Sequence, residues 1–274
     1  MTWIVSSRGV AIVVMRAIAI GIVFAVARTT VDTSGRGVFA ALALEALGGA
    51  VLGLWLALIA TRVVGSNARA AVAVGALVFV NLVAVMIEGA AFAPATQSPG
   101  ALPIAVLLQM IVAILVGTAT IAFIRRPRSD DAAPALPAAR SAISWVVRYA
   151  TCALVYVGLY FVVGAINYTL VTGPYYRSGV AGLVVPPPEL VLFVAAVEGA
   201  LMPLAVLPLL YVLPGSRRRR ALISGTSLFV LGAVVPLIVA PSLPLFLRVS
   251  SAIEILFQKF PAGAAAAALL GPED

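Results

Sequence analysis

Residues 190–213 read LVLFVAAVEGALMPLAVLPLLYVL, and this run establishes the class of protein. It is long and apolar enough to cross a bilayer as one helix, and its single charged side chain is Glu198. Gly199 follows the glutamate directly, and Pro203 and Pro208 lie further along the run. We therefore predict a transmembrane helix that carries a carboxyl group beside a weakened stretch of backbone.

The rest of the chain has the same composition. Of its 274 residues, 63% are hydrophobic and 10% are charged, whereas soluble proteins carry about 25% charged residues. A soluble fold could not bury this much apolar surface, so lipid must be the solvent for most of the chain. Alternating strands of about ten residues, which build membrane barrels, are not visible. The predicted fold class is an all-α, polytopic integral membrane helical bundle.

Eight spans are expected when about 20 apolar residues are required for each. The sequence Ala25-Val26-Ala27 resembles a signal-peptide cleavage site, but Arg16 interrupts the apolar region before it, so we expect the first span to be retained. The predicted spans are residues 10–27, 38–61, 70–92, 102–124, 142–166, 190–213, 221–240 and 243–270.

The basic residues predict the orientation. Eleven arginines fall in the terminal segment and loops on one side of the predicted spans, and three fall in the loops on the other. Cytoplasmic loops carry such an excess, so both termini are expected in the cytoplasm and the protein in the cell membrane as a multi-pass protein. The formal charge of +8 is not a nucleic-acid signature, because the arginines lie in short clusters between spans. These clusters are expected to bind anionic lipid headgroups.

Enzyme chemistry finds little support in the residues. The chain has no histidine and a single cysteine, Cys152, which excludes histidine metal sites, Ser-His triads and an intrachain disulfide. No phosphate-binding loop or other catalytic motif is present. We therefore predict no catalytic residue, metal or cofactor, and the sequence favours a protein that is not an enzyme.

The chain divides into two halves. Residues 1–126 and 142–274 each hold four predicted spans, and the Pro- and Ala-rich segment 127–141 is expected to be a cytoplasmic linker. Arg16 and Arg148 lie at similar places in the first helix of each half, and Glu45 and Glu198 begin similar runs in the second. These matches predict a parallel 4+4 internal repeat. Chance similarity between Ala- and Val-rich helices is the alternative.

Charged groups inside the spans are the candidate site. Glu45, Glu88 and Glu198 lie seventeen to nineteen residues from a cytoplasmic arginine, which is about 25–28 Å along a helix. The three carboxyls are therefore expected in the outer half of the bilayer. Asn81 is expected deeper.

The remaining charged groups of the spans lie nearer the cytoplasm. Arg16 and Arg148 are expected toward the inner half of the membrane. Lys259 lies toward the cytoplasmic end of the last span, where a lysine typically anchors a helix to the interface.

The leading hypothesis is a small permease whose polar path is lined by these carboxylates, the amide and the two arginines. For Arg16, Arg148 and Glu88 an interfacial or packing role is favoured over a place in this path. The alternative for Glu45 and Glu198 is pairing with arginines that fixes helix packing. A second hypothesis is a non-catalytic subunit that stabilises a larger membrane complex. Membrane-protein partners or a homo-oligomer are compatible with both hypotheses.

Overall fold

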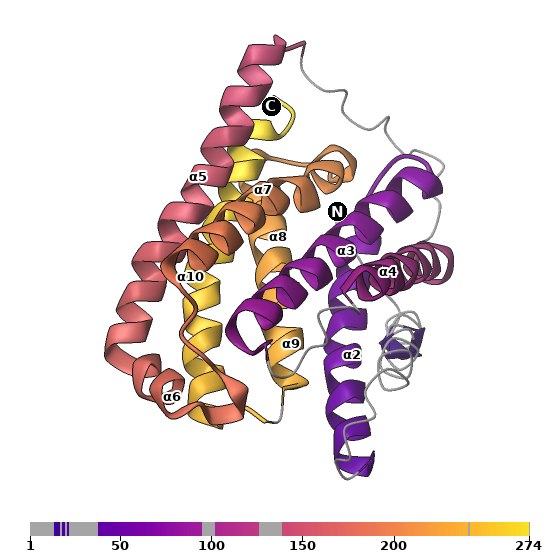
Figure 1. Ribbon diagram of the computed structural model, residues 1–274. Helices are drawn as coiled ribbons and strands as arrows, with labels where there is room; N and C mark the ends of the chain where they lie inside the picture. Colours follow the sequence, from indigo (N-terminus) through magenta and orange to yellow (C-terminus); the bar gives the residue numbers. More distant parts are fainter. Residues whose placement is uncertain are drawn as a thin grey trace.

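A computed structural model describes residues 14–16, 18–19, 21, 38–94, 102–125, 139–240 and 242–273. Every regular element in these ranges is helical, and they contain no strand (Figure 1). The elements are α2 (Val38–Ala60), α3 (Asn67–Phe92), α4 (Leu102–Ile124), α5 (Ala142–Asn167), η3 (Tyr168–Thr172), α6 (Gly173–Ser178), η4 (Val180–Gly182), α7 (Pro188–Val212), α8 (Arg217–Phe229), η5 (Val230–Val234), α9 (Val235–Ile238) and α10 (Leu245–Leu270).

Seven helices in the described ranges are long and apolar enough to cross a membrane. They coincide with the second to eighth predicted spans, so the all-helical prediction is confirmed for this part of the chain, and the length and composition of these helices fit a membrane helical bundle. Most of the first predicted span, the resemblance to a cleavage site, and most of the linker 127–141 lie outside the described residues.

The fifth span is longer than predicted. After α5 the backbone widens into the π-helix η3 and continues as α6, so the segment GPYYRS, expected in a loop, is helical. Pro174 stands at the start of α6, where a missing N–H costs nothing. Gly179, with a φ of 68°, then ends the helix in the left-handed conformation.

Two helices begin with the same local sequence, Gly-Ser. Gly65 and Gly215 have φ values of 89° and 111°, which favour glycine, and Ser66 and Ser216 are the N-cap residues of α3 and α8. The four arginines after Ser216 form the first turn of α8, so this helix starts earlier than the predicted span.

The packing of the bundle depends on close helix crossings. α8 packs most extensively on α10, and α3 on α4 and α7 (Figure 1). A Cβ on Gly263 of α10 would lie 2.7 Å from the backbone of Gly225 in α8. A Cβ on Gly117 of α4 would lie 2.9 Å from the amide nitrogen of Gly75 in α3. Glycine at these points therefore sets the distance between the helices.

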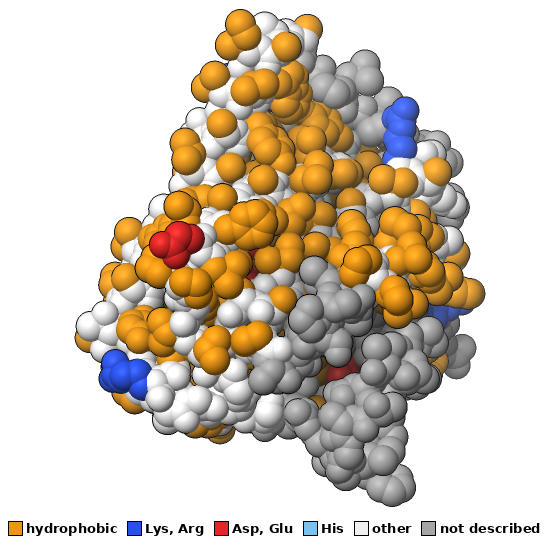
Figure 2. All heavy atoms as spheres, in the orientation of Figure 1, with side chains coloured by type: hydrophobic (Ala, Val, Ile, Leu, Met, Phe, Trp, Pro, Cys, Tyr) orange, Lys and Arg blue, Asp and Glu red, His pale blue; other side chains and the backbone are white. Residues whose placement is uncertain are grey.

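The surface is as apolar as the core. Large hydrophobic side chains on several helices are exposed, including Ile143, Leu154 and Leu170. Hydrophobic side chains cover most of the described part of the face in Figure 2, and few charges interrupt them. Such a surface is unfavourable in water but matches the hydrocarbon of a bilayer.

Candidate functional site

Glu198 lies at the centre of a buried polar core. It is 0% exposed, on α7, which continues as one helix through Pro203 and Pro208. The Tyr156 hydroxyl of α5 donates a hydrogen bond to its Oε2, whereas its Oε1 has no hydrogen-bond partner among the described residues. One half of the carboxyl is thus held, and the other half is available to a further donor.

The backbone next to Glu198 is closely packed. A Cβ on Gly199 would lie 2.9 Å from the carbonyl oxygen of Ala153, so glycine allows α7 to approach α5. The Tyr149 hydroxyl donates to the carbonyl of Ala200. Pro203 cannot donate to the carbonyl of Gly199, which leaves this stretch with fewer helical hydrogen bonds.

Lys259 belongs to the same core, and its predicted role as an interfacial anchor is wrong. It is 0% exposed and lies eleven residues before the end of α10, about 16 Å along the helix. Its Nζ has no hydrogen-bond partner in the described part of the chain. A four-carbon stem normally reaches the interface, so a buried ammonium needs space made for it inside the protein.

Gly232 in the π-helix η5 provides that space. A Cβ on this residue would lie 2.6 Å from Lys259 Nζ and 3.1 Å from Asn81 Oδ1. The ammonium and the amide oxygen therefore face the same bare piece of backbone. Asn81 Nδ2 is held by the carbonyl of Leu77 at 2.8 Å, whereas its Oδ1 has no partner among the residues described.

Further carboxyls extend the core toward the other end of the bundle. Glu88 of α3 is half-buried and lies within electrostatic range of Glu198, Lys259 and Glu254. Tyr160 of α5 lies within range of all three glutamates. The core thus joins α3, α5, α7 and α10.

Glu254 is the most fully hydrogen-bonded member. Asn167 Nδ2 donates to its Oε2, and Gln258 Nε2 donates to its Oε1 at 3.0 Å. Ser250 Oγ donates to Asn167 Oδ1 at 2.5 Å. Gly164 allows this carboxyl to lie against α5, because a Cβ there would be 3.3 Å from its Oε1.

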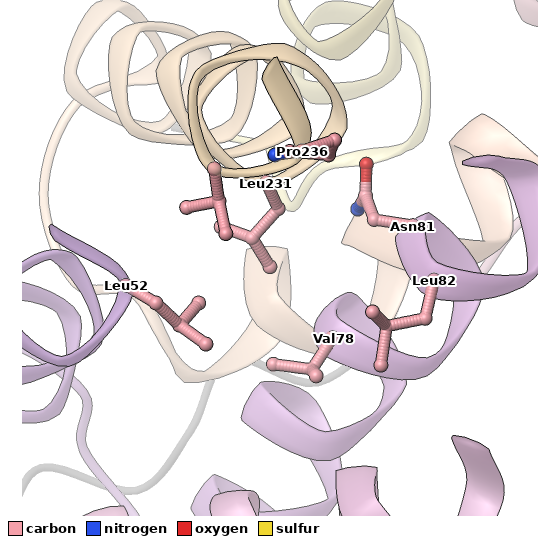
Figure 3. A pocket seen from close by; sticks show the side chains of 7 residues that line it. Leu52, Val78, Asn81, Leu82, Leu231 and Pro236 are labelled. Carbon is pink, nitrogen blue, oxygen red and sulfur yellow. The ribbon is translucent and has the colours of Figure 1, made fainter. Parts of the chain in front are cut away.

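A small cavity adjoins the core at Asn81. Its volume is about 20 Å³, and it is lined by apolar side chains of α2, α3, η5 and α9, with the Asn81 amide at one edge (Figure 3). This volume accommodates about one water molecule. The lining residues are Leu52, Val78, Asn81, Leu82, Leu231, Val235 and Pro236.

A larger groove opens on the outer surface. It measures about 440 Å³ and lies between the α5–η3 segment and α10. Its walls include Leu170, Phe246 and Phe257, and Asn167 and Glu254 also line it. The groove therefore brings a mainly apolar surface close to the Glu254 end of the polar core.

Arg16 and Arg148 lie away from the polar core. Arg16 Nη1 donates to the carbonyl of Phe123 near the end of α4, at 2.6 Å. Arg148 Nη1 donates to the carbonyl of Leu269 near the end of α10, at 3.1 Å. Both guanidinium groups thus cap a helix C-terminus, where cations are favoured and carbonyls lack donors.

Several more side chains complete the cap of α10, and we call this set the collar. Arg140, Arg148, Tyr211, Arg217 and Arg220 donate to the carbonyls of residues 268–272. Arg140 also forms an ion pair with Glu273, at 3.3 Å. The collar fixes the end of the last helix to α5, α7 and α8.

Glu45 is half-buried on α2, and this helix packs on α9, α4 and η5. Of the six predicted site residues, the structure brings together Glu88, Glu198 and Asn81, places Arg16 and Arg148 at helix ends, and leaves Glu45 on a separate helix. Within the described ranges, no group of three His, Cys, Asp or Glu side chains is placed to hold a metal ion.

Sequence reasoning missed Lys259, Tyr156 and Gly232. The distance of Lys259 from the end of its helix was an available signal. Nothing local identifies Gly232, because its effect depends on a lysine from another helix.

Comparison with known proteins gives no match: no protein-family model, no curated protein and no solved structure is similar to this chain.

Proposed function

We propose that this protein is a small permease of the cell membrane that moves a small cation, protons included, through the polar core around Glu198. Seven apolar helices in the described ranges, a further span predicted from residues 10–27 and the arginine-rich loops on one side favour eight spans with both termini in the cytoplasm. The exposed arginines of the first turn of α8 are placed to bind anionic headgroups at that interface.

The two halves of the bundle are related as a parallel repeat, and the arginine caps support this. Arg16 and Arg148 each donate from the first helix of a half to the penultimate residue of its last helix, Phe123 or Leu269. In the first helix of the first half, Gly21 lies five residues after Arg16 and contacts Gly49 of α2.

The second half repeats that spacing. Ala153 lies five residues after Arg148 and contacts Gly199 of α7. Gly75 and Gly225 each lie nine residues after their N-cap serine. Gly117 and Gly263, which cross them, each lie six residues before the carbonyl that accepts the arginine.

The spacing also assigns the carboxyl to one half only. If Gly49 corresponds to Gly199, then Glu198 corresponds to Gly48 rather than to Glu45. The same register pairs Asn81 with Leu231, and both of these line the small cavity. The repeat therefore contains one polar core per chain.

The observation that supports transport is the state of Glu198. A wholly buried carboxyl with one unpartnered oxygen costs several kcal/mol in an apolar interior. Intramembrane carboxyls of this kind mark ion and proton pathways. The π-helix η5 places irregular backbone within the bundle, as in transporters, and in the continuous helix α7 Pro203 and Pro208 each remove one helical hydrogen-bond donor.

Flux through liposomes tests the proposal. Wild-type protein, E198Q and the control E189Q are reconstituted into vesicles that contain a pH-sensitive dye, and pulses of sodium, potassium or ammonium chloride are applied. Glu189 is exposed in the first turn of the same helix. We expect E198Q to lose at least tenfold in rate, and E189Q to stay within twofold of wild type. Equal rates for the two variants would remove the assignment.

A non-catalytic subunit is the second candidate, and the groove between α5 and α10 favours it. A transmembrane helix of a partner could fill this apolar surface. Purification in mild detergent distinguishes the two: a partner at fixed stoichiometry supports the subunit, and an active chain purified alone supports the permease.

A further inference from the structure

The polar core contains a cation of its own. Lys259 brings an ammonium group to the level of Asn81 and within electrostatic range of Glu88 of α3, and Glu88 is itself within range of Glu198 of α7. Yet it forms no ion pair within 4.0 Å with any carboxylate of the described residues. The ammonium is thus within electrostatic range of a carboxyl but forms no direct contact with one among the described residues.

Three orphan atoms define what the core can accept. Glu198 Oε1 and Asn81 Oδ1 are acceptors without donors, and Lys259 Nζ is a donor without an acceptor. Buried polar atoms are nearly always satisfied, so acceptors of this kind call for a donor that the described side chains do not supply. A carboxyl oxygen favours a donor that is also positively charged.

The position of the Lys259 side chain depends on the absence of a side chain at Gly232. If η5 presented a side chain here, the lysine would have to shift, since a Cβ would lie 2.6 Å from Nζ and 2.7 Å from Cδ. No hydrogen bond has to break for the ammonium to leave this position. Turns of π-helix within a longer helix are common at functional sites.

We propose that the side chain of Lys259 competes with a free cation for the carboxyls of the polar core, and that this free ligand is a small ammonium-type cation. This inference rests on the proposed function and names its substrate class. An –NH3+ group is already accommodated beside Gly232, so a free ion of similar size and hydrogen-bonding capacity matches the same surroundings. When such an ion binds at Glu198, repulsion between like charges drives Lys259 away from the carboxyls.

The chemistry excludes other classes of cation from this role. A divalent metal needs several oxygen ligands around one point, and the acidic side chains of the described ranges form no such group. A quaternary ammonium ion has no N–H to donate to Glu198 Oε1 or Asn81 Oδ1. The two acceptors without a donor, Glu198 Oε1 and Asn81 Oδ1, favour a small ion with N–H donors, such as ammonium or methylammonium, over sodium or potassium, which have no hydrogen to donate.

Binding to purified protein in detergent tests the inference. Methylammonium chloride and, in separate titrations, choline chloride are added at constant ionic strength to wild type, K259A, K259Q and the double variant E198Q/K259A. Affinity is read by calorimetry, and folding by size-exclusion chromatography.

We expect K259A to bind methylammonium at least tenfold more tightly than wild type, because the competitor is gone and its space is open. K259Q, which fills the space without charge, should show a smaller gain and keeps the test valid if K259A does not fold. E198Q/K259A should show no binding.

If K259A and K259Q bind methylammonium with the affinity of wild type, Lys259 does not compete with the ligand. If choline binds as tightly as methylammonium, the ligand does not need N–H donors. Flux that depends on Glu198 in vesicles would leave the permease proposal standing in either case. Loss of that dependence would refute the permease itself.

Discussion

The crossing of α8 and α10 makes a quantitative prediction for Gly263→Ala. The new Cβ would lie 2.7 Å from both the Cα and the amide nitrogen of Gly225, whereas relaxed carbon contacts are about 3.5–4.0 Å. These neighbours are backbone atoms and cannot rotate away, so the two helices must separate by about 1 Å. Overpacking of this kind costs about 1–3 kcal/mol.

Gly158→Ala is the matched control. Gly158 is also in a helix interior, but nothing lies within 4 Å of the position that its Cβ would occupy. Alanine is the better helix former, so this variant should be unchanged or more stable by up to about 1 kcal/mol.

Stability is measured by SDS titration in mixed micelles, with tryptophan fluorescence as the signal. The two variants should differ by about 1–4 kcal/mol in free energy of unfolding. Equal stability of G263A and G158A would refute the view that bare backbone sets the α8–α10 distance.

Three further predictions concern other parts of the bundle. Gly117→Ala should destabilise by about the same 1–3 kcal/mol as Gly263→Ala, since the new Cβ would lie 2.9 Å from the amide nitrogen of Gly75; a neutral G117A in the same titration would count against the close α3–α4 crossing. Arg148→Gln should lower the free energy of unfolding by about 1.5–3 kcal/mol, because it removes a charged donor to the end of α10. R218Q changes an exposed arginine next to the collar and should lower it by less than about 0.5 kcal/mol. The same unfolding curves measure both values. Cys152 is 1% exposed and is the only cysteine, so a maleimide dye should label it in the folded protein at least a hundredfold more slowly than in SDS; rapid labelling would contradict its burial.

Much of the fold could be predicted because helix length and bilayer thickness are physically matched. Runs of Ala, Leu and Val located the spans of α2 to α10 to within a few residues. The exceptions lie where local signals compete. The GPYYRS segment looked like a loop because of its Gly and Pro, yet a turn of π-helix absorbs the change and Pro174 is tolerated at the first turn of α6.

The candidate site could be predicted only in part. The burial of Glu198 followed from its sequence, because a lone carboxyl amid apolar residues has to face protein. Lys259 could not be placed in the same way, since a long side chain can reach the interface from several turns away. Its buried position depends on the space that Gly232 of η5 leaves for the ammonium, and no local sequence pattern connects the two residues.

The two inner arginines show a related limit. Their depth in the membrane was predicted, but their partners are carbonyl groups at the ends of α4 and α10, which every helix has. A carbonyl has no signature in the sequence, so the competing view of Arg16 and Arg148 as parts of a polar path could not be dismissed from the residues.

The collar also limits how α10 can move. Residues 268–272 are fastened to three other helices, whereas Pro261, inside α10, removes the donor to the carbonyl of Phe257. Any bending therefore concentrates at this proline, immediately beyond Lys259. Glu254 lies seven residues away, about 10 Å, so a flexure of about 10° swings its carboxyl by about 2 Å. The C-terminal end of α10 is thus fixed, and bending at Pro261 would move the segment that carries Glu254 and Lys259.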